Sequence, residues 1–267
     1  MSKRDIPKRA VAYERIAQLR KQNISNKEII KTICKEFEIP YGTIHGWIKY
    51  NFSPFGKRKL RYNESFFYVI GALLGDGCAY YWKKGDKYMV NLVGEKEFID
   101  KYSNKLFDCT GKKVKGYLDR SKNIWNHKTW NFELFQILNN SKKDVSILIP
   151  LIKKDNYKEK SLNLIEGFFD AEGCVKIIKE PIRKTPKICL DICSTDLPIL
   201  EIIREELNRQ LNIEARYSIQ KYEDRKTAYH LRIYKKEAVR KFLNNINTIK
   251  LKPEKIECVN NWLNNGF

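Results

Sequence analysis

The chain has 267 residues and a formal net charge of +20, an excess that favours a polyanionic partner without specifying any sequence. Its longest apolar run, Phe66 to Gly75, is about half the length of a membrane span, and its basic N-terminus lacks the apolar stretch of a signal peptide. Seven cysteines without a C-x-x-C pair and three scattered histidines argue against a disulfide framework or a zinc site, so we expect a cytoplasmic, reducing environment.

The first 62 residues are strongly basic, with 15 Lys or Arg against 5 Asp or Glu. Within them, the segment from Val11 to Gln22 is amphipathic and predicts a helix. Ser25 is followed three residues later by Glu28, the signature of a capping box. The apolar residues from Ile29 to Phe37 recur at helical spacing, which predicts a second helix directly after that cap.

A short third helix is predicted from Tyr41 to Tyr50, after a turn at Glu38 to Pro40. This arrangement is typical of a helix-turn-helix, whose second helix reads the DNA major groove. The expected outward-facing DNA-binding residues are Tyr41, Thr43, His45 and Lys49. A three-helix unit without DNA contact gives the same pattern, but the local charge favours the DNA-binding interpretation. We therefore predict a helix-turn-helix domain over residues 1–55.

Residues 56–64 are predicted to form a basic linker, because Pro54 and Gly56 argue against a continuing helix. The basic cluster of this linker either follows a phosphate backbone or serves as a plain tether. Its candidate DNA-binding residues are Lys57, Arg58, Lys59 and Arg61.

Two apolar segments further along the chain end in the same way. Residues 69–77 read VIGALLGDG, and residues 165–173 read IEGFFDAEG. In each, small residues four apart share one helical face, so two such helices can bring their backbones close together. The glycine after each carboxylate, Gly77 or Gly173, is expected to end its helix in the left-handed conformation.

The carboxylates of these motifs are predicted to form a metal site. At a helix C-terminus, an anion lies at the negative end of the macrodipole beside unpaired carbonyl groups, which is unfavourable unless a cation joins it. Magnesium accepts carboxylates, waters and phosphate oxygens. The expected ligands are Asp76 and Glu172, with the carbonyl oxygens of Gly75 and Ala171. Structural helices with incidental terminal acids are the alternative, but two copies in register argue against it.

Each motif precedes the same predicted order of elements: two strands, a helix, two strands and a helix. Alternation of period two places one sheet face on the helices and the other outward. The outward sets are rich in side chains that hydrogen-bond base edges and phosphates, although a solvated face looks similar. On one strand, Ala215, Tyr217 and Ile219 are expected to face the helices. The outward candidates for DNA contact are Lys87, Asn91, Lys113, Lys115, Lys187, Arg216, Ser218, Gln220, His230 and Arg232.

The two motifs and the elements after them resemble the LAGLIDADG homing endonucleases, in the single-chain form that carries both copies. The resemblance covers roughly residues 65 to 267. It implies an α+β fold of two pseudo-symmetric αββαββα halves, residues 65–155 and 156–267, with saddle-shaped antiparallel sheets. Each sheet would lie in the major groove of double-stranded DNA, and the protein would act as a monomer.

The implied activity is site-specific double-strand cleavage, the hydrolysis of phosphodiester bonds with Mg²⁺ or Mn²⁺ at Asp76 and Glu172. Asp170, whose counterpart in the first motif is Leu74, is expected to be structural. Glu166 is expected at a solvated or interface position.

One departure from the family pattern concerns the strand ends near the attacking water. Many members place a Lys or Gln there, whereas this chain has Val93 and Cys193. Lys176 and Lys187 are the nearest substitutes and are expected beside the metal ligands.

Two other functions stay open. One is a DNA-binding regulator that has lost cleavage, and the other is a maturase that binds its own intron RNA through the same sheets. Retention of both carboxylates favours the nuclease, because a pure binder gains nothing from two anions beside phosphate. The chain ends lack the catalytic residues of an intein, so a free-standing or intron-encoded protein is expected.

Overall fold

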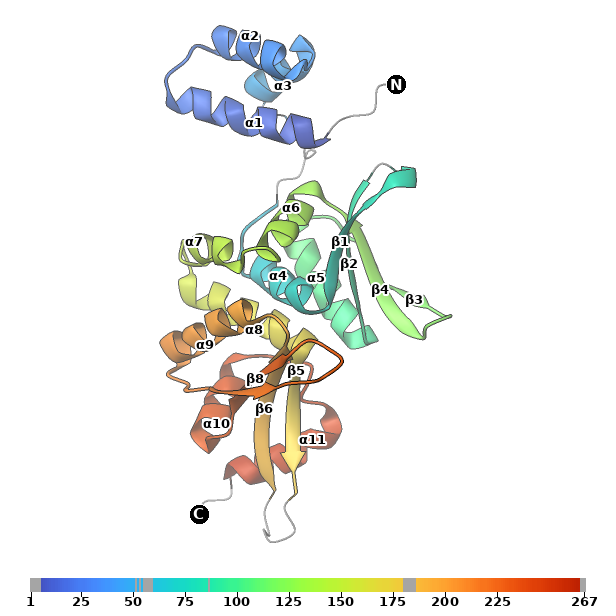
Figure 1. The fold of residues 1–267 in the computed structure, drawn as a ribbon, viewed down its shortest axis with the longest axis vertical. Helices are drawn as coiled ribbons and strands as arrows, with labels where there is room; N and C mark the ends of the chain where they lie inside the picture. The colour runs from blue at the N-terminus through green and yellow to red at the C-terminus, as the bar shows by residue number, and fades with distance from the viewer. Residues whose placement is uncertain are drawn as a thin grey trace.

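The computed structural model describes residues 6–50, 52, 54, 60–85, 87–179 and 186–264. In Figure 1, the N-terminal helices form a group of their own, and the rest of the chain forms further groups that each combine a sheet with helices. The basic residues Lys57, Arg58 and Lys59 of the predicted linker lie outside the described residues.

The N-terminal group is all-α, as predicted. It consists of α1 (Ile6–Lys21), α2 (Asn26–Phe37) and α3 (Tyr41–Lys49) around a small hydrophobic cluster of its own. The capping box at the start of α2 is confirmed: the backbone N–H of Glu28 donates to Ser25 Oγ, and the Ser25 N–H donates to the Glu28 carboxylate, both at 3.3 Å. Helix α1 begins five residues earlier than its periodic pattern predicted.

The two halves follow the predicted αββαββα order. The first consists of α4 (Glu64–Asp76), β1 (Gly77–Trp82), the 3₁₀ turn η1 (Lys83–Gly85), β2 (Lys87–Gly94), α5 (Lys96–Thr110), β3 (Tyr117–Asp119), β4 (Ile124–Trp130) and α6 (Phe132–Ser141). The second consists of α8 (Tyr157–Glu172), β5 (Gly173–Ile178), β6 (Lys187–Ser194), α9 (Leu197–Leu211), β7 (Arg216–Gln220), β8 (Ala228–Ile233) and α10 (Lys236–Asn245). A connection containing η2 (Val145–Leu148) and α7 (Ile149–Ile152) joins them, and α11 (Pro253–Asn264) follows the second half.

The two sheets have the same topology, β1-β2-β4-β3 and β5-β6-β8-β7, with antiparallel neighbours. Their registers also correspond: Cys78 pairs with Asn91 in the first sheet, and Cys174 pairs with Asp191 in the second. Because side chains alternate along a strand, corresponding positions lie on corresponding faces. The internal duplication seen in the motifs therefore extends through both sheets.

Three sequence expectations are wrong in detail. Gly77 and Gly173 are extended, with φ of −94° and −88°, so the helices end without a left-handed residue. A Cβ atom at Gly77 would lie 2.5 Å from the Leu73 carbonyl oxygen, and this close approach accounts for the glycine. Ile219 is 61% exposed, because it lies on the edge strand β7 beyond the helices that cover the sheet. Lastly, His230, expected to face outward in solvent, is buried together with Asp191 on the same face of the sheet.

Candidate metal and DNA site

Helices α4 and α8 touch along their small residues. A Cβ atom at Gly167 would lie 2.0 Å from the Tyr68 carbonyl oxygen, and one at Gly71 would lie 2.3 Å from the Leu164 carbonyl oxygen. Only a residue without a side chain allows this approach of two backbones. At the helix ends, a Cβ atom at Gly75 would meet the Ala171 methyl group at 2.5 Å. The predicted close packing of the two motif helices is thus confirmed.

This contact brings Asp76 and Glu172, the last residues of α4 and α8, to the same place. Partial desolvation at the contact between the two helices raises the pKa of both carboxyl groups, and the negative charge of Asp76 raises the pKa of Glu172 further. Asp76 stays solvent-exposed and Glu172 is half-buried, so both remain open to a ligand. Within the described part of the chain, neither carboxylate takes part in a hydrogen bond or ion pair. The two negative charges repel each other, and a cation bound between them would offset this repulsion.

The donor set fits a hard divalent cation of the magnesium type. The described residues contain no cluster of three or more His, Cys, Asp or Glu side chains that could hold a metal ion. With only two carboxylates as protein side-chain ligands, most coordination positions of a bound ion are left to waters and phosphate oxygens, which is the arrangement that magnesium prefers. A structural zinc or calcium site requires more protein ligands than this place offers.

Two lysines that the sequence reasoning missed approach these carboxylates. Lys142, directly after α6, donates from Nζ to the Gly77 carbonyl oxygen at 2.6 Å. Lys250, after α10, donates to the Ala171 carbonyl oxygen at 3.2 Å, so this predicted metal ligand is engaged by an ammonium group. The charges of both lysines act to lower the pKa of Glu172 and partly oppose the effect of burial. Both lysines follow the last helix of their half, but no local sequence pattern indicates that they turn back to the motif ends.

Asp170 fixes the segment that carries Lys250, in agreement with the structural role expected for it. The carboxylate is fully buried and accepts hydrogen bonds from Tyr68 Oη at 2.9 Å and from Lys101 Nζ at 2.7 Å. It also accepts from Thr248 Oγ1 at 2.7 Å and from the backbone N–H of residue 249 at 3.0 Å. The loop before Lys250 is therefore tied to the end of α8.

Ion pairs also join the two halves. Lys101 on α5 pairs with Glu166 on α8 at 2.8 Å, so Glu166 lies at an interface and not in solvent. Lys252 pairs with Glu95 at 2.6 Å and with Glu97 at 3.2 Å. Each of these pairs links one half of a single polypeptide to the other.

The outward face of the second sheet is organised around Asp191. This carboxylate is bound by Lys176, by His230 Nδ1 at 3.1 Å and by Arg232 Nε at 3.2 Å. Burial alone would raise the pKa of Asp191, but the hydrogen bonds from Lys176 and His230 hold it below its usual value. The sequence did not indicate that Asp191 would bind these basic side chains. Lys176, expected beside the metal ligands, is held in this network.

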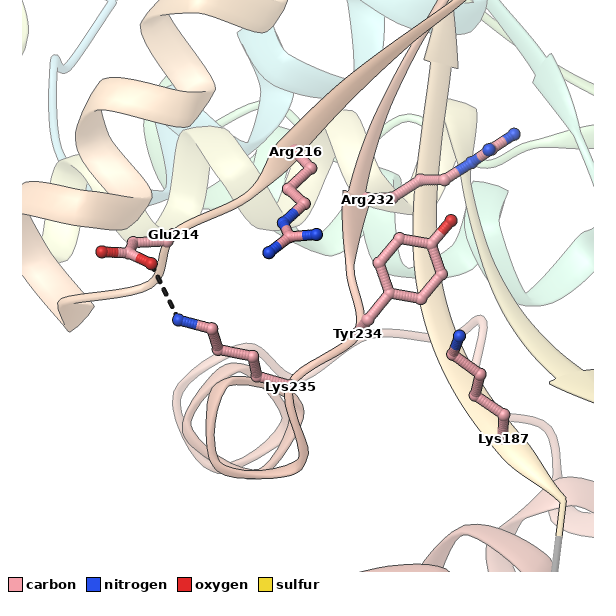
Figure 2. A pocket seen from close by; sticks show the side chains of 6 residues that line it. All are labelled: Lys187, Glu214, Arg216, Arg232, Tyr234 and Lys235. Atoms are coloured by element: carbon pink, nitrogen blue, oxygen red, sulfur yellow. Dashed lines mark hydrogen bonds and ion pairs between the residues drawn. The ribbon is translucent and has the colours of Figure 1, made fainter.

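The basic residues further along the second sheet lie away from the carboxylates. Gly173, next to Glu172, pairs with Ile192, whereas Lys187 lies at the opposite end of β6. Five residues of strand separate these positions by about 17 Å, so Lys187 cannot assist at the metal site. Lys187 instead lines a pocket of about 350 Å³. Figure 2 shows it there together with Glu214, Arg216, Arg232, Tyr234 and Lys235.

The structure also gives the exposure of the remaining DNA candidates. On α3, Tyr41 and Lys49 are exposed, and Thr43 and His45 are half-buried. In the predicted linker, Arg61 is exposed. In the first half, Lys87, Lys113 and Lys115 are exposed, and Asn91 is half-buried. On β7 and β8, Ser218 is half-buried, and Gln220 Oε1 lies 3.3 Å from His230 Nε2.

The raised pKa of the two acids predicts that Asp76→Asn or Glu172→Gln stabilises the metal-free protein. Ionisation costs more free energy in the folded chain than in the unfolded chain. This cost is absent below the ordinary pKa, 3.8 for Asp and 4.5 for Glu, and grows as pH rises through the raised value. Each variant should therefore melt a few degrees higher than the wild type at neutral pH, and at the same temperature in acid.

Thermal melts in chelator across this pH range measure the effect. Added Mg²⁺ should narrow the difference at neutral pH, because it stabilises only a chain that binds it. Equal melting temperatures at neutral pH in chelator would contradict the electrostatic argument.

Comparisons with known proteins identify relatives of this chain. A domain family described as LAGLIDADG-like matches residues 159–247. An uncharacterized protein of Methanocaldococcus jannaschii is 30% identical over 263 residues, which cover 91% of this chain and 90% of the relative. The two proteins therefore align over nearly their whole length.

Two solved structures share the fold at lower identity. The homing endonuclease I-DmoI, in complex with DNA and calcium, is 20% identical with a TM-score of 0.51, over 73% of this chain and 96% of that one. The N-terminal LAGLIDADG domain of DUF199/WhiA is 17% identical with a TM-score of 0.50, over 77% and 89%. Together with two motif helices in contact and two sheets in matching register, these findings show that the chain belongs to the LAGLIDADG family, in the form that carries both motifs in one polypeptide.

Proposed function

We propose that the protein is a site-specific, double-strand DNA endonuclease of the homing type that uses Mg²⁺ or Mn²⁺. The observation that carries the proposal is the meeting of Asp76 and Glu172 at the contact between α4 and α8. A regulator or a structural protein has no use for two partly desolvated carboxylates with raised pKa values beside a phosphate-binding surface.

In this proposal Asp76 and Glu172 hold the divalent ion, with the Gly75 and Ala171 carbonyl groups close by. The ion, when bound, supplies an activated water and neutralises charge on the scissile phosphate and the leaving oxygen. Lys142 and Lys250 lie on either side, and each points its ammonium group at a backbone carbonyl of a motif end. They are available to pair with phosphate oxygens, so each half contributes one acid and one cation.

The second sheet supplies part of the DNA contact. Asp191 holds Lys176, His230 and Arg232 in fixed positions, so these side chains lose little conformational freedom on binding. Beyond them, Lys187, Arg216 and Lys235 around the pocket in Figure 2 suit backbone phosphates. We propose that this face follows the DNA away from the cleavage position.

We propose the domain division 1–55, 56–64, 65–155 and 156–267, with residues 1–55 as a helix-turn-helix that contacts flanking DNA through α3. Deletion of residues 1–55 should weaken binding and reduce the dependence of log K on log salt concentration, by about 0.9 for each phosphate group that the truncated protein no longer binds. The cleavage position should not move, because Asp76 and Glu172 both remain. Salt titrations and footprints of full-length and truncated protein test this, and identical slopes would show that residues 1–55 do not contact DNA.

A DNA-binding regulator without cleavage is the second candidate. The observation in its favour is that Val93 and Cys193, at the ends of β2 and β6, offer no cation or amide to a water. The intron RNA of a maturase is a third possible ligand of the same surface. Neither candidate explains the two acids.

The direct test is cleavage of a library of random duplexes in Mg²⁺, with chelator as the control. Cut products that share one sequence would support the endonuclease and reveal its site. Sequence-specific binding without any cleavage in Mg²⁺ or Mn²⁺ would favour the regulator. Sedimentation of the complex between the protein and its DNA substrate then tests whether one protein chain binds each duplex, as we propose.

A further inference from the structure

The outer face of α3 carries a row of aromatic side chains. Tyr41, the first residue of the helix, is 63% exposed. Tyr50 and Phe52, directly after the helix, are 57% and 56% exposed. His45, one helical turn after Tyr41, is half-buried. We call these four residues, Tyr41, His45, Tyr50 and Phe52, the aromatic row.

The rings of the row contact one another. Those of Tyr41 and His45 are stacked, with their centres 5.7 Å apart and their planes inclined by 17°. His45 meets Tyr50 edge to face at 6.0 Å, and the Tyr50 ring lies 5.7 Å from that of Phe52. Aromatic pairs at such distances stabilise each other. The row is therefore an ordered apolar surface before any ligand binds.

The packing of the three N-terminal helices does not require this row. Their hydrophobic cluster uses the opposite face of α3, where Ile44 is fully buried and Trp47 is 5% exposed. Trp47 packs edge to face on Tyr13 of α1. Within the described part of the chain, the cluster contains none of the four row residues. An exposed apolar surface without a role in the core marks a binding surface.

The residue types of α3 limit which bases it can read. Guanine is read by Arg or Lys, adenine by Asn or Gln, and cytosine by Asp or Glu. Between Tyr41 and Tyr50, Lys49 is the only residue of these types. It lies at the C-terminal end of α3, whereas the N-terminal residues of a recognition helix contact the base edges. The N-terminal part of α3 instead offers rings, which pack against the methyl group that thymine presents in the major groove.

We propose that α3 selects duplex DNA rich in thymine, through contacts of Tyr41 and His45 with thymine methyl groups in the major groove. The inference rests on the proposed contact between residues 1–55 and flanking DNA, and it adds the base that this contact selects. Lys49 supplies a phosphate contact that is independent of sequence. The strong positive charge of the first 62 residues favours DNA over an apolar protein surface as the partner.

The experiment compares two duplexes that differ only in methyl groups. One consists of alternating A·T pairs, and in the other deoxyuridine replaces thymidine. Chelator keeps both uncut while their affinities for the full-length protein are measured. The deoxyuridine duplex should bind more weakly, by about fourfold for each methyl group that the row covers. Tyr41→Ser and His45→Ser should each lose about fourfold on the thymidine duplex and little on the deoxyuridine duplex.

Lys49→Met is the matched control on the same helix, because it removes a charge and no ring. It should weaken binding of both duplexes by the same factor and reduce the log–log salt slope by about 0.9. Circular dichroism of each variant separates lost contacts from unfolding, and the two duplexes test the wild type without any variant.

Two outcomes would overturn the inference alone: equal affinity of the wild type for both duplexes, or a ratio of affinities that neither Tyr41→Ser nor His45→Ser changes. In either case, weaker binding by a protein that lacks residues 1–55 would leave the proposed flanking contact in place. If that truncated protein binds both duplexes like the wild type, the flanking contact and the inference are both wrong.

Discussion

Asp76→Asn and Glu172→Gln should each reduce double-strand cleavage at least about a hundredfold, while DNA affinity stays nearly unchanged. Each acid holds the ion that stabilises negative charge on the reacting phosphate, so its loss acts on the transition state. Neither acid contributes favourably to the binding of a polyanion. Each substitution also removes a negative charge beside the DNA, so any change in affinity should be towards slightly tighter binding.

A matched control is available on the same helix as Glu172. Glu159→Gln makes the same chemical change at an exposed position in the first turn of α8, far from the helix end. It should cut like the wild type. Plasmid cleavage and duplex binding, measured together for all three variants, give the comparison. Wild-type cutting by both Asp76→Asn and Glu172→Gln would exclude the carboxylates from the chemistry, whatever the protein's affinity for DNA.

The parts that were predictable from the sequence depend on short-range patterns. The capping box of α2 is a signal within four residues, and it is present as predicted. The spacing of Gly71 and Gly75, repeated in Gly167 and Ala171, predicted a backbone contact between two helices, and both sides of that contact are confirmed. This prediction was strong because the same spacing of small residues occurs in both copies of the motif.

The parts that were not predictable depend on tertiary contacts. Nothing near Lys142 or Lys250 in the sequence shows that the last helix of each half directs a lysine back to the motif. Alternation along β6 places Asp191 on the outward face, but it cannot show that Lys176, His230 and Arg232 from neighbouring strands surround the carboxylate. The left-handed conformation expected at Gly77 was wrong for a related reason. The chain enters a strand there, and the constraint on the residue is the nearby Leu73 backbone.

Gly167→Ala should destabilise the protein and abolish cleavage together. The added methyl group would lie 2.0 Å from the Tyr68 carbonyl oxygen and 2.9 Å from the Ala72 backbone nitrogen. Both atoms belong to the backbone of α4, so no side chain can move aside and the two helices must separate. Overpacking of this kind costs about 1–3 kcal/mol, and more where the backbone cannot adjust. Separation also moves Asp76 away from Glu172, so the shared cation loses one ligand.

Gly42→Ala is the control, because Gly42 lies in α3 with no atom within 4 Å of the added methyl group. Alanine favours a helix over glycine by up to about 1 kcal/mol, so this variant should be neutral or slightly more stable. Denaturant unfolding gives the stability of both variants, and Mg²⁺-dependent cleavage gives their activity. A folded Gly167→Ala protein that has lost cleavage but still binds DNA would confirm that the helix contact sets the distance between the acids. Wild-type stability and cutting by Gly167→Ala would mean that other contacts, such as Lys101 with Glu166, hold the two carboxylates together.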